Sequence, residues 1–194
     1  GKDGIISRNY TERCNLKRGH GSTNALYKLE LLMKQASISP ADRPVAVKAM
    51  EVEQETKAPA AVIELPDGTL VDGKTSDLLG SSAAVILNAL KELDGTDHRT
   101  LLIPPEALEP ITRLKTEYLG SRNPRLHSDE VLPALSISAA HSEAAKAALE
   151  QLPNLRGLEI HCSVMLSAAD EKIFRKLGMH LTCEPKREAA VDLK

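Results

Sequence analysis

The sequence predicts an α/β fold, with a mixed or mainly parallel sheet flanked by helices and an N-terminal helical arm. Three observations lead to this fold class. Apolar residues recur at helical spacing in segments such as 22–36 and 81–95. Short apolar runs bounded by turn residues, such as 60–65, indicate strands. Near the end of the chain, strand patterns at 158–166 and 179–184 flank a helix pattern, which is typical of a βαβ unit.

The patterns divide the chain into four segments. Residues 1–21 are polar and show no helical or strand period, so we expect an arm or a truncated start. Residues 22–58 should form a helical segment that packs on the core, and residues 59–186 the α/β domain itself. The last segment, 187–194, is expected to be a tail. A chain of 194 residues has room for one ordinary domain with an appendage.

Boundary signals place the elements of the first half. Ser22 or Thr23 caps the first helix, and Pro44 delays the regular part of a second helix that runs from about Pro40 to Lys57. The next expected elements are a hairpin of strands 60–65 and 69–71 around the turn Pro66-Asp67-Gly68, a helix capped by Ser81 or Ser82 that ends near Gly95, a strand at 100–103, and a helix at 106–119 that Pro110 shortens or kinks.

The second half shows comparable signals. Ser128 should cap a helix that carries Asp129 and Glu130 in its first turn, and Ser142 should cap the next one. The remaining expected elements are the strand 158–166, a helix with a Ser167-Asp170 capping box that Gly178 closes, and the strand 179–184.

Composition excludes several functional classes. A net charge of -2 gives no positive excess for binding a nucleic-acid backbone, and one Phe, three Tyr and no Trp leave little for base stacking. No apolar run approaches the roughly 18 residues of a membrane span, so we expect no membrane partner and a cytoplasmic location. The three cysteines, Cys14, Cys162 and Cys183, show no CxxC spacing and are expected to be reduced thiols.

The stretch 68–75 matches the letters of a P-loop, G-x-x-x-x-G-K-[ST]. Its physical chemistry argues against that function. A P-loop needs small residues that let backbone N–H groups surround phosphates, whereas Leu70 and Val71 favour a strand and Asp72 would repel phosphate. A working lysine would also open a helix directly, yet the helix pattern begins only near Ser81. We therefore expect a hairpin here.

Two loops remain as candidate sites for a small anionic ligand that bears phosphate or carboxylate groups. Each precedes a helix N-terminus, where free N–H groups and the helix dipole favour negative charge. The alternative for both loops is ordinary helix capping and surface hydrogen bonding. The candidate residues are Lys74, Thr75, Ser76, Ser81 and Ser82 in the first loop, and Arg122, Arg125 and His127 in the second.

Catalytic residues are not identified by the sequence. His127 is the one candidate for acid–base chemistry, against the alternative of a structural hydrogen-bonder, and no nucleophile elbow or HExxH motif is present. The six histidines lack metal-ligand spacing, so we expect no metal. His161 and His180 would meet beside the strand cysteines only if their strands pair in a suitable register. Whether the chain is an enzyme stays open.

Three segments carry a resemblance to a known family: LPDGTLVDGKTSDLLGSSAAVILNALK, YLGSRNPRLHSDEVLPALSISAA and DEKIFRKLGMHLTCEP. Together, over about residues 29–185, the chain resembles the C-terminal part of a bacterial family, domain of unknown function 1846. The resemblance implies a fragment or abbreviated member whose N-terminal half, similar to P-loop kinases, is absent. Any nucleotide would then bind through that half, and this chain itself would hold no cofactor. Some members of the family are labelled ATP-dependent peptidases.

Three functional hypotheses follow. The first is a domain that binds a small anionic ligand as the substrate-side part of a larger protein. The second is a homo-oligomerisation or interaction domain, because the small residues of 131–140 and 144–152 allow close helix contacts and the N-terminal half is a natural partner. The third is part of an ATP-dependent peptidase, which the absence of a nucleophile or metal-ligand pattern disfavours.

Overall fold

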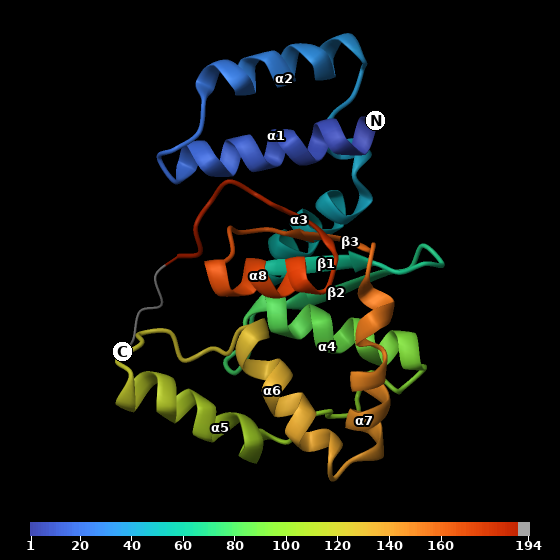
Figure 1. Ribbon diagram of the computed structural model, residues 1–194, viewed down its shortest axis with the longest axis vertical. Coiled ribbons are helices and arrows are strands. Elements are labelled where there is room, and N and C mark those ends of the chain that lie inside the picture. Colours follow the sequence, from blue (N-terminus) through green and yellow to red (C-terminus); the bar gives the residue numbers. More distant parts are fainter. Residues whose placement is uncertain (190–194) are drawn as a thin grey trace.

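The computed structural model describes residues 1–189 and contains a four-stranded sheet in the order β2-β1-β3-β4, with helices on both faces (Figure 1). β1 runs antiparallel to both β2 and β3, while β3 and β4 are parallel, so the sheet is mixed. Helix α8 connects β3 to β4, which confirms the βαβ unit. The strands are β1 Ala60–Glu64, β2 Leu70–Lys74, β3 Glu159–Cys162 and β4 His180–Cys183.

The helices form two layers. Helices α1 and α3 contact one face of the sheet, whereas α4 packs on the other face, beside α6, α7 and α8 (Figure 1). Their bounds are α1 Lys2–Lys17, α2 Thr23–Gln35, α3 Pro44–Thr56, α4 Ser81–Asp94, α5 Pro105–Arg113, α6 Ser128–Ala139, α7 Glu143–Glu150 and α8 Ala168–Lys176, with short turns η1 Pro40–Asp42 and η3 Leu152–Leu155 and a π-helical turn η2 Leu114–Tyr118.

Strand alternation divides the core between the two layers. In β1, Ala61 and Ile63 belong to the large cluster that includes the apolar face of α4. Val62, between them, packs against Val45 and Ala49 of α3 on the opposite face. Both faces of the central strand are therefore buried, which explains its unbroken apolar sequence.

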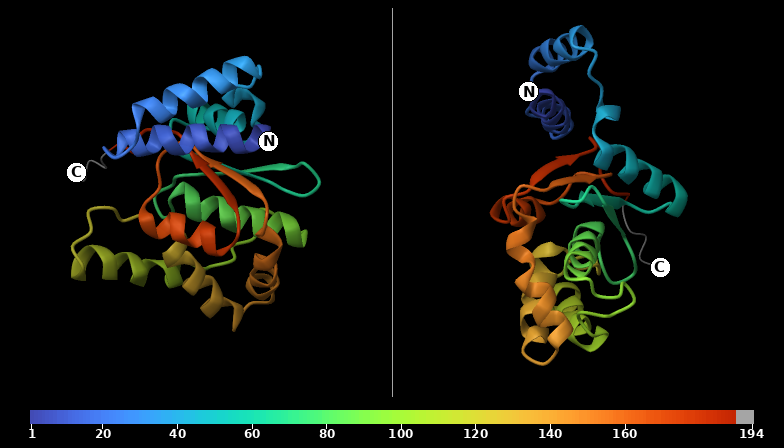
Figure 2. Two further views of the ribbon diagram at one scale, coloured as in Figure 1. Left: turned by 45° about the horizontal axis from the view of Figure 1, so that its top comes forward. Right: turned by 90° about the vertical axis from the view of Figure 1, so that its right-hand side faces the viewer.

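Helix α1 corrects the expectation that residues 1–21 lack regular structure. Its buried residues, Ile6, Asn9, Tyr10 and Cys14, do have helical spacing, but two of the four are polar or aromatic, so an aliphatic period is not visible. Helix α2 contacts α1 and lies farther from the sheet, as both views in Figure 2 show. The N-terminal arm is therefore a helical hairpin.

Polar side chains join this arm and α3 to the sheet. The ring of His161 is fully buried, with Nδ1 2.6 Å from Thr182 Oγ1 and Nε2 3.2 Å from Glu184 Oε1. Tyr10 of α1 stacks on this ring at a tilt, with 4.8 Å between the ring centroids.

Arg43, just before α3, donates to Thr182 Oγ1 at 2.8 Å and forms an ion pair with Glu159. This face of the sheet is therefore held by hydrogen bonds as well as apolar contacts.

Two expected elements differ from the structure. Residues 100–103 form no strand, although Leu102 and Ile103 are buried in the core, because this segment passes over α4 rather than pairing with the sheet. The expected helix 106–119 is regular only in α5, and it continues from Leu114 as the π-helical turn. Of the expected tail 187–194, the last five residues lie outside the described residues.

The P-loop letters form the β1–β2 hairpin. Gly68 lies in the turn with a φ of +87°, and residues 70–74 are the strand β2. Gly73 permits the close approach of α4, because a Cβ there would lie 2.3 Å from the backbone nitrogen of Val85. Gly73, the second glycine of the motif, is thus explained by packing. The expectation of a hairpin is confirmed.

The two loops singled out in the sequence lie side by side. Leu126 N–H donates to the Leu78 carbonyl at 2.9 Å, and Gly80 N–H donates to the Leu126 carbonyl at 2.9 Å. This short parallel bridge joins the loop before α4 to the loop before α6. The N-termini of the two helices consequently converge on one point.

The carboxylate of Asp170 occupies that point. Asp170 is 2% exposed, and its Oδ1 accepts from Ser82 Oγ at 2.9 Å, from Ser128 N–H at 2.9 Å and from Ser128 Oγ at 2.5 Å. Asp170 also lies in the first turn of α8, so one buried negative charge stands at three helix N-termini. The site at which an external anion was expected is filled by this chain's own carboxylate.

Asp170 changes the expected capping. Ser82 and Ser128 do not act as caps, because their hydroxyls donate to Asp170, and the N-cap positions are Gly80 and His127. Ser167 does cap α8, accepting from Asp170 N–H at 3.2 Å. The other half of the expected capping box is missing, since the Asp170 carboxylate points to the serines of α4 and α6.

We predict that Asp170→Asn lowers the free energy of unfolding by about 2 kcal/mol or more, because three buried hydrogen bonds lose their charged acceptor. Chemical denaturation measures the change. Glu143→Gln is the matched control, since Glu143 also lies in a first helical turn but is exposed, and its loss should cost less than about 1 kcal/mol. Equal effects of the two substitutions would contradict the structural role of Asp170.

We also predict that stability falls as the pH drops below about 6.5. Burial lowers the pKa of His161, an effect that the hydrogen bond and the charge of Glu184 only partly offset, while the charges of Arg43 and Arg13 lower it further. The folded state therefore favours the neutral ring, and the unfolded chain binds more protons as the pH falls. Urea unfolding between pH 7.5 and 5.5 should show this loss. His161→Gln should flatten the dependence of the unfolding free energy on pH, whereas His98→Gln, at an exposed position, should leave it unchanged. Identical pH dependence for wild type and His161→Gln would contradict the assignment of the effect to His161.

Candidate functional site

The candidate site is a cavity of about 930 Å³ at the ends of the strands, which we call the strand-end pocket. It lies where β2 and β3 end and β1 begins, beside the end of α3. In α/β folds ligands commonly bind beyond the carboxyl ends of strands. Its lining residues are Met50, Glu53, Gln54, Lys57, Ala58, Pro59, Thr75, Ser76, Asp77, Arg125, Val164, Lys186, Arg187, Glu188 and Ala189.

Three of the residues predicted from the sequence meet in this pocket: Thr75, Ser76 and Arg125. Thr75 leaves the sheet immediately after β2, with its N–H donating to the Pro59 carbonyl at 2.9 Å. Arg125 Nε donates to the Ser76 carbonyl at 2.7 Å. This bond fixes the guanidinium at the pocket wall, so that its orientation is set by the bridged loops rather than by a ligand.

Four cationic side chains line the pocket, and they differ in their partners. Lys186 forms an ion pair with Glu53 of α3. Arg125 Nη1 lies 3.8 Å from Glu188 Oε1. Lys57, which ends α3 in the left-handed region with a φ of +57°, has no ion-pair partner within residues 1–189. The pocket thus combines a fixed arginine with an exposed lysine.

Lys57, Lys186 and Arg187 were missed at the sequence level. Lys57 follows a charged helix end whose sequence is typical of a solvent-exposed face. Its position in the pocket depends on the packing of α3 against the sheet, which the sequence does not indicate. The Lys186-Arg187 pair directly after Pro185 was a usable signal, because it follows the last strand, which was expected at 179–184 and is observed at His180–Cys183.

The other predicted residues lie elsewhere. Lys74 is exposed at the end of β2, and Arg122 is exposed in the loop before Arg125. Ser81 and Ser82 are buried beneath the loops, at 4% and 1% exposure. His127 lies between Asn123 Nδ2, 3.3 Å from its Nε2, and Gly80, whose added Cβ would lie 3.2 Å from its ring. None of these five lines the strand-end pocket.

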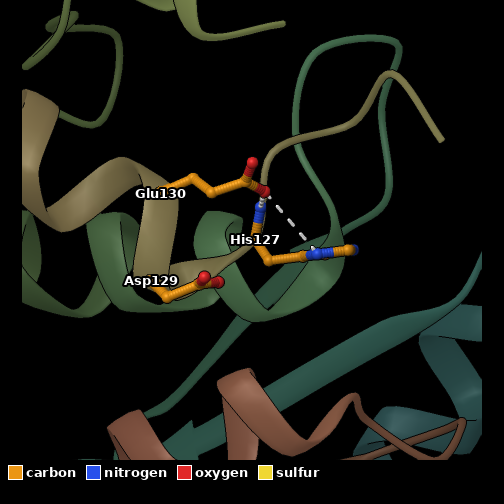
Figure 3. Close-up of side chains that lie close together, drawn as sticks. All are labelled: His127, Asp129 and Glu130. Carbon is orange, nitrogen blue, oxygen red and sulfur yellow. Dashed lines mark hydrogen bonds and ion pairs between the residues drawn. The ribbon is translucent and has the colours of Figure 1, made fainter. Parts of the chain in front are cut away.

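His127, Asp129 and Glu130 form a separate group at the start of α6, with one potential ligand atom each within 4.8 Å of the others (Figure 3). The surroundings oppose a cation. Glu130 Oε1 already accepts from His127 N–H at 3.0 Å and from Lys115 Nζ at 2.9 Å. Both that ammonium and the helix N-terminus repel positive charge.

Asp129 is an incompletely hydrogen-bonded member of this group. One of its carboxylate oxygens is buried without a hydrogen-bond partner among residues 1–189. Burial, followed by the charges of Glu130 and Asp170, raises the pKa of Asp129. The positive N-terminus of α6 therefore already serves several carboxylates of the chain itself. We read the group as the polar start of the helix.

The thiols offer no exposed nucleophile. All three cysteines are buried, and burial raises the pKa of Cys14 to about 11. The hydrogen bond to Cys183, together with burial, raises the pKa of Cys162. His180 is exposed and pairs in register with Glu159, so it does not meet His161.

The small residues that led to the assembly hypothesis pack against other parts of the same chain. Helices α6 and α7 pack on each other, and Ala134, Ala145 and Ala148 belong to the main core. That observation no longer favours assembly, which stays an untested prediction. Within the described part of the chain, no helix has the length and apolar character needed to cross a bilayer.

Comparison with known proteins places the chain in a family. Residues 41–190 match the model of the domain of unknown function DUF1846, C-terminal. Among curated relatives, UPF0371 proteins of Corynebacterium glutamicum and Corynebacterium efficiens are 50% and 51% identical over 182 residues. A UPF0371 protein of Streptococcus sanguinis is 46% identical over 181 residues.

These alignments cover 93–94% of the chain but only 37% of each relative, so the relatives are considerably longer proteins. The match to the C-terminal family model agrees with the three segments that carry the resemblance in the sequence. The chain belongs to the DUF1846 family and contains its C-terminal domain.

Proposed function

We propose that the strand-end pocket binds a small anionic ligand, with phosphate or carboxylate groups, as the substrate-side part of a longer protein. The observation that supports the proposal is the position of Arg125. Its Nε is bonded to the Ser76 carbonyl, and its Nη1 lies 3.8 Å from Oε1 of Glu188, another residue of the pocket lining. A guanidinium held in this way loses little freedom when it binds a phosphate or carboxylate.

The composition of the pocket walls supports the same ligand class. Lys57, Lys186 and Arg187 add positive charge around Arg125, and the hydroxyls of Thr75 and Ser76 add hydrogen-bond donors. The volume of about 930 Å³ falls within the roughly 300–1,000 Å³ range of small-molecule sites. Among the described residues that line the pocket, none is aromatic, so the site offers charge rather than base stacking.

The proposal is for binding, without an assigned reaction. Arg125 and the lysines can orient an anion and neutralise its charge, which are functions of a substrate-side surface. The nucleophile or base that a reaction requires would come from the rest of the longer protein. A nucleotide bound by that remaining part would present its phosphates to such a surface.

We predict that inorganic pyrophosphate binds to the pocket and raises the melting temperature. Arg125→Gln should weaken the affinity about 10-fold or more, because a charged hydrogen-bond donor is lost. Calorimetric titration at constant ionic strength measures this change. Arg113→Gln is the matched control, since Arg113 is exposed on α5 and lies outside the pocket.

Absence of binding by phosphate, pyrophosphate and citrate at millimolar concentration would contradict the proposal. Equal loss of affinity in Arg125→Gln and Arg113→Gln would also contradict it, since binding would then follow net charge and not the pocket. Because Arg125 is partly exposed, its substitution should leave the unfolding transition close to that of the wild type.

A further inference from the structure

The segment 184–189, which we call the C-terminal strap, runs along one wall of the strand-end pocket. Lys186 N–H donates to the Glu184 carbonyl at 2.8 Å, and Met165 N–H donates to the Lys186 carbonyl at 2.8 Å. The Lys186 ammonium forms the ion pair with Glu53 of α3. The strap is thus fixed at Lys186 by both its backbone and its side chain.

Two residues beyond this fixed point, Glu188 reaches the predicted anion-binding group. Its Oε1 lies 3.8 Å from Arg125 Nη1, and the two side chains are 33% and 23% exposed. The pairing is a long one between partly solvated groups, so it stabilises the folded chain only weakly. Such a contact holds the arginine in the absence of ligand and is readily exchanged.

Glu188 approaches the guanidinium through Nη1, whereas Nε is bonded to the Ser76 carbonyl. The carboxylate therefore uses the face of Arg125 that an external anion requires. Without Glu188, the charged lining residues are Lys57, Arg125, Lys186 and Arg187 against Glu53 and Asp77, an excess of two positive charges; with Glu188 the excess is one. The carboxylate lowers the attraction for any anion and stands at its contact point.

We propose that Glu188 is an internal competitor for the anion site, and that a ligand binds Arg125 by displacing this carboxylate. The inference rests on the proposed function and adds a regulatory element to it. The Lys186–Glu53 pair does not involve Arg125 or Glu188, so Glu188 leaves by a side-chain movement while Lys186 keeps the strap in place. Ligand affinity is then set by the exchange of one anion for another.

The experiment titrates inorganic pyrophosphate into the full chain and its variants at fixed ionic strength. Glu188→Gln should tighten binding about 3- to 5-fold, which corresponds to loss of a weak competing ion pair. Glu150→Gln, an exposed substitution on α7 with the same change in net charge, should leave the affinity unchanged. In an Arg125→Gln background, Glu188→Gln should have a much smaller effect, because the two residues act through one contact.

Each outcome separates the two proposals. Equal affinity of wild type and Glu188→Gln, together with loss of binding in Arg125→Gln, would overturn the competitor while the anion site stands. Equal tightening by Glu188→Gln and Glu150→Gln would also overturn it, since only net charge would matter. No binding by the wild type or by any variant would overturn both proposals.

Discussion

The buried carboxylate of Asp170 is the interaction on which the arrangement of this domain depends. It accepts hydrogen bonds from the first turns of α4 and α6 while lying in the first turn of α8. A helix N-terminus carries unpaired N–H groups and partial positive charge, and three such ends would repel one another if they met in an apolar core. One negative charge lies in or against the first turn of all three helices. The helices that pack on this face of the sheet are consequently fixed relative to one another at a single point.

This constraint also determines where an external ligand has room to bind. The helix N-termini are closed by Asp170, and the neighbouring His127–Glu130 turn is occupied by Lys115. The outer edge of the bridged loops remains available to a ligand. There the Ser76 carbonyl orients Arg125 at the strand-end pocket. Arg43 and the His161 network fix α3 on the opposite face of the sheet, and α3 ends at the pocket with Lys57. The positive charge of the pocket is therefore assembled from elements on both faces.

Much of the fold follows from local patterns in the sequence. The hairpin around Gly68, the βαβ unit and the end of α4 at Gly95 each carry a signal that depends on a few neighbouring residues. Helix α1 carried no such signal, because it is held by Tyr10 on a buried histidine rather than by an aliphatic stripe. The segment 100–103 has the composition of a strand, yet it buries Leu102 and Ile103 beside α4 without pairing. Both errors come from tertiary contacts that periodicity does not record.

The candidate site shows the same limit. Both loops were predicted from the sequence, but their contact was not. The acidic residue at their helix ends is some forty residues further along the chain and looked like an ordinary capping residue. A structure of the chain with bound pyrophosphate tests this account most directly. The account predicts pyrophosphate in contact with the Arg125 guanidinium in the strand-end pocket, with Asp170 still bonded to Ser82 and Ser128. Pyrophosphate bound at the N-termini of α4 and α6, with Asp170 displaced, would contradict it.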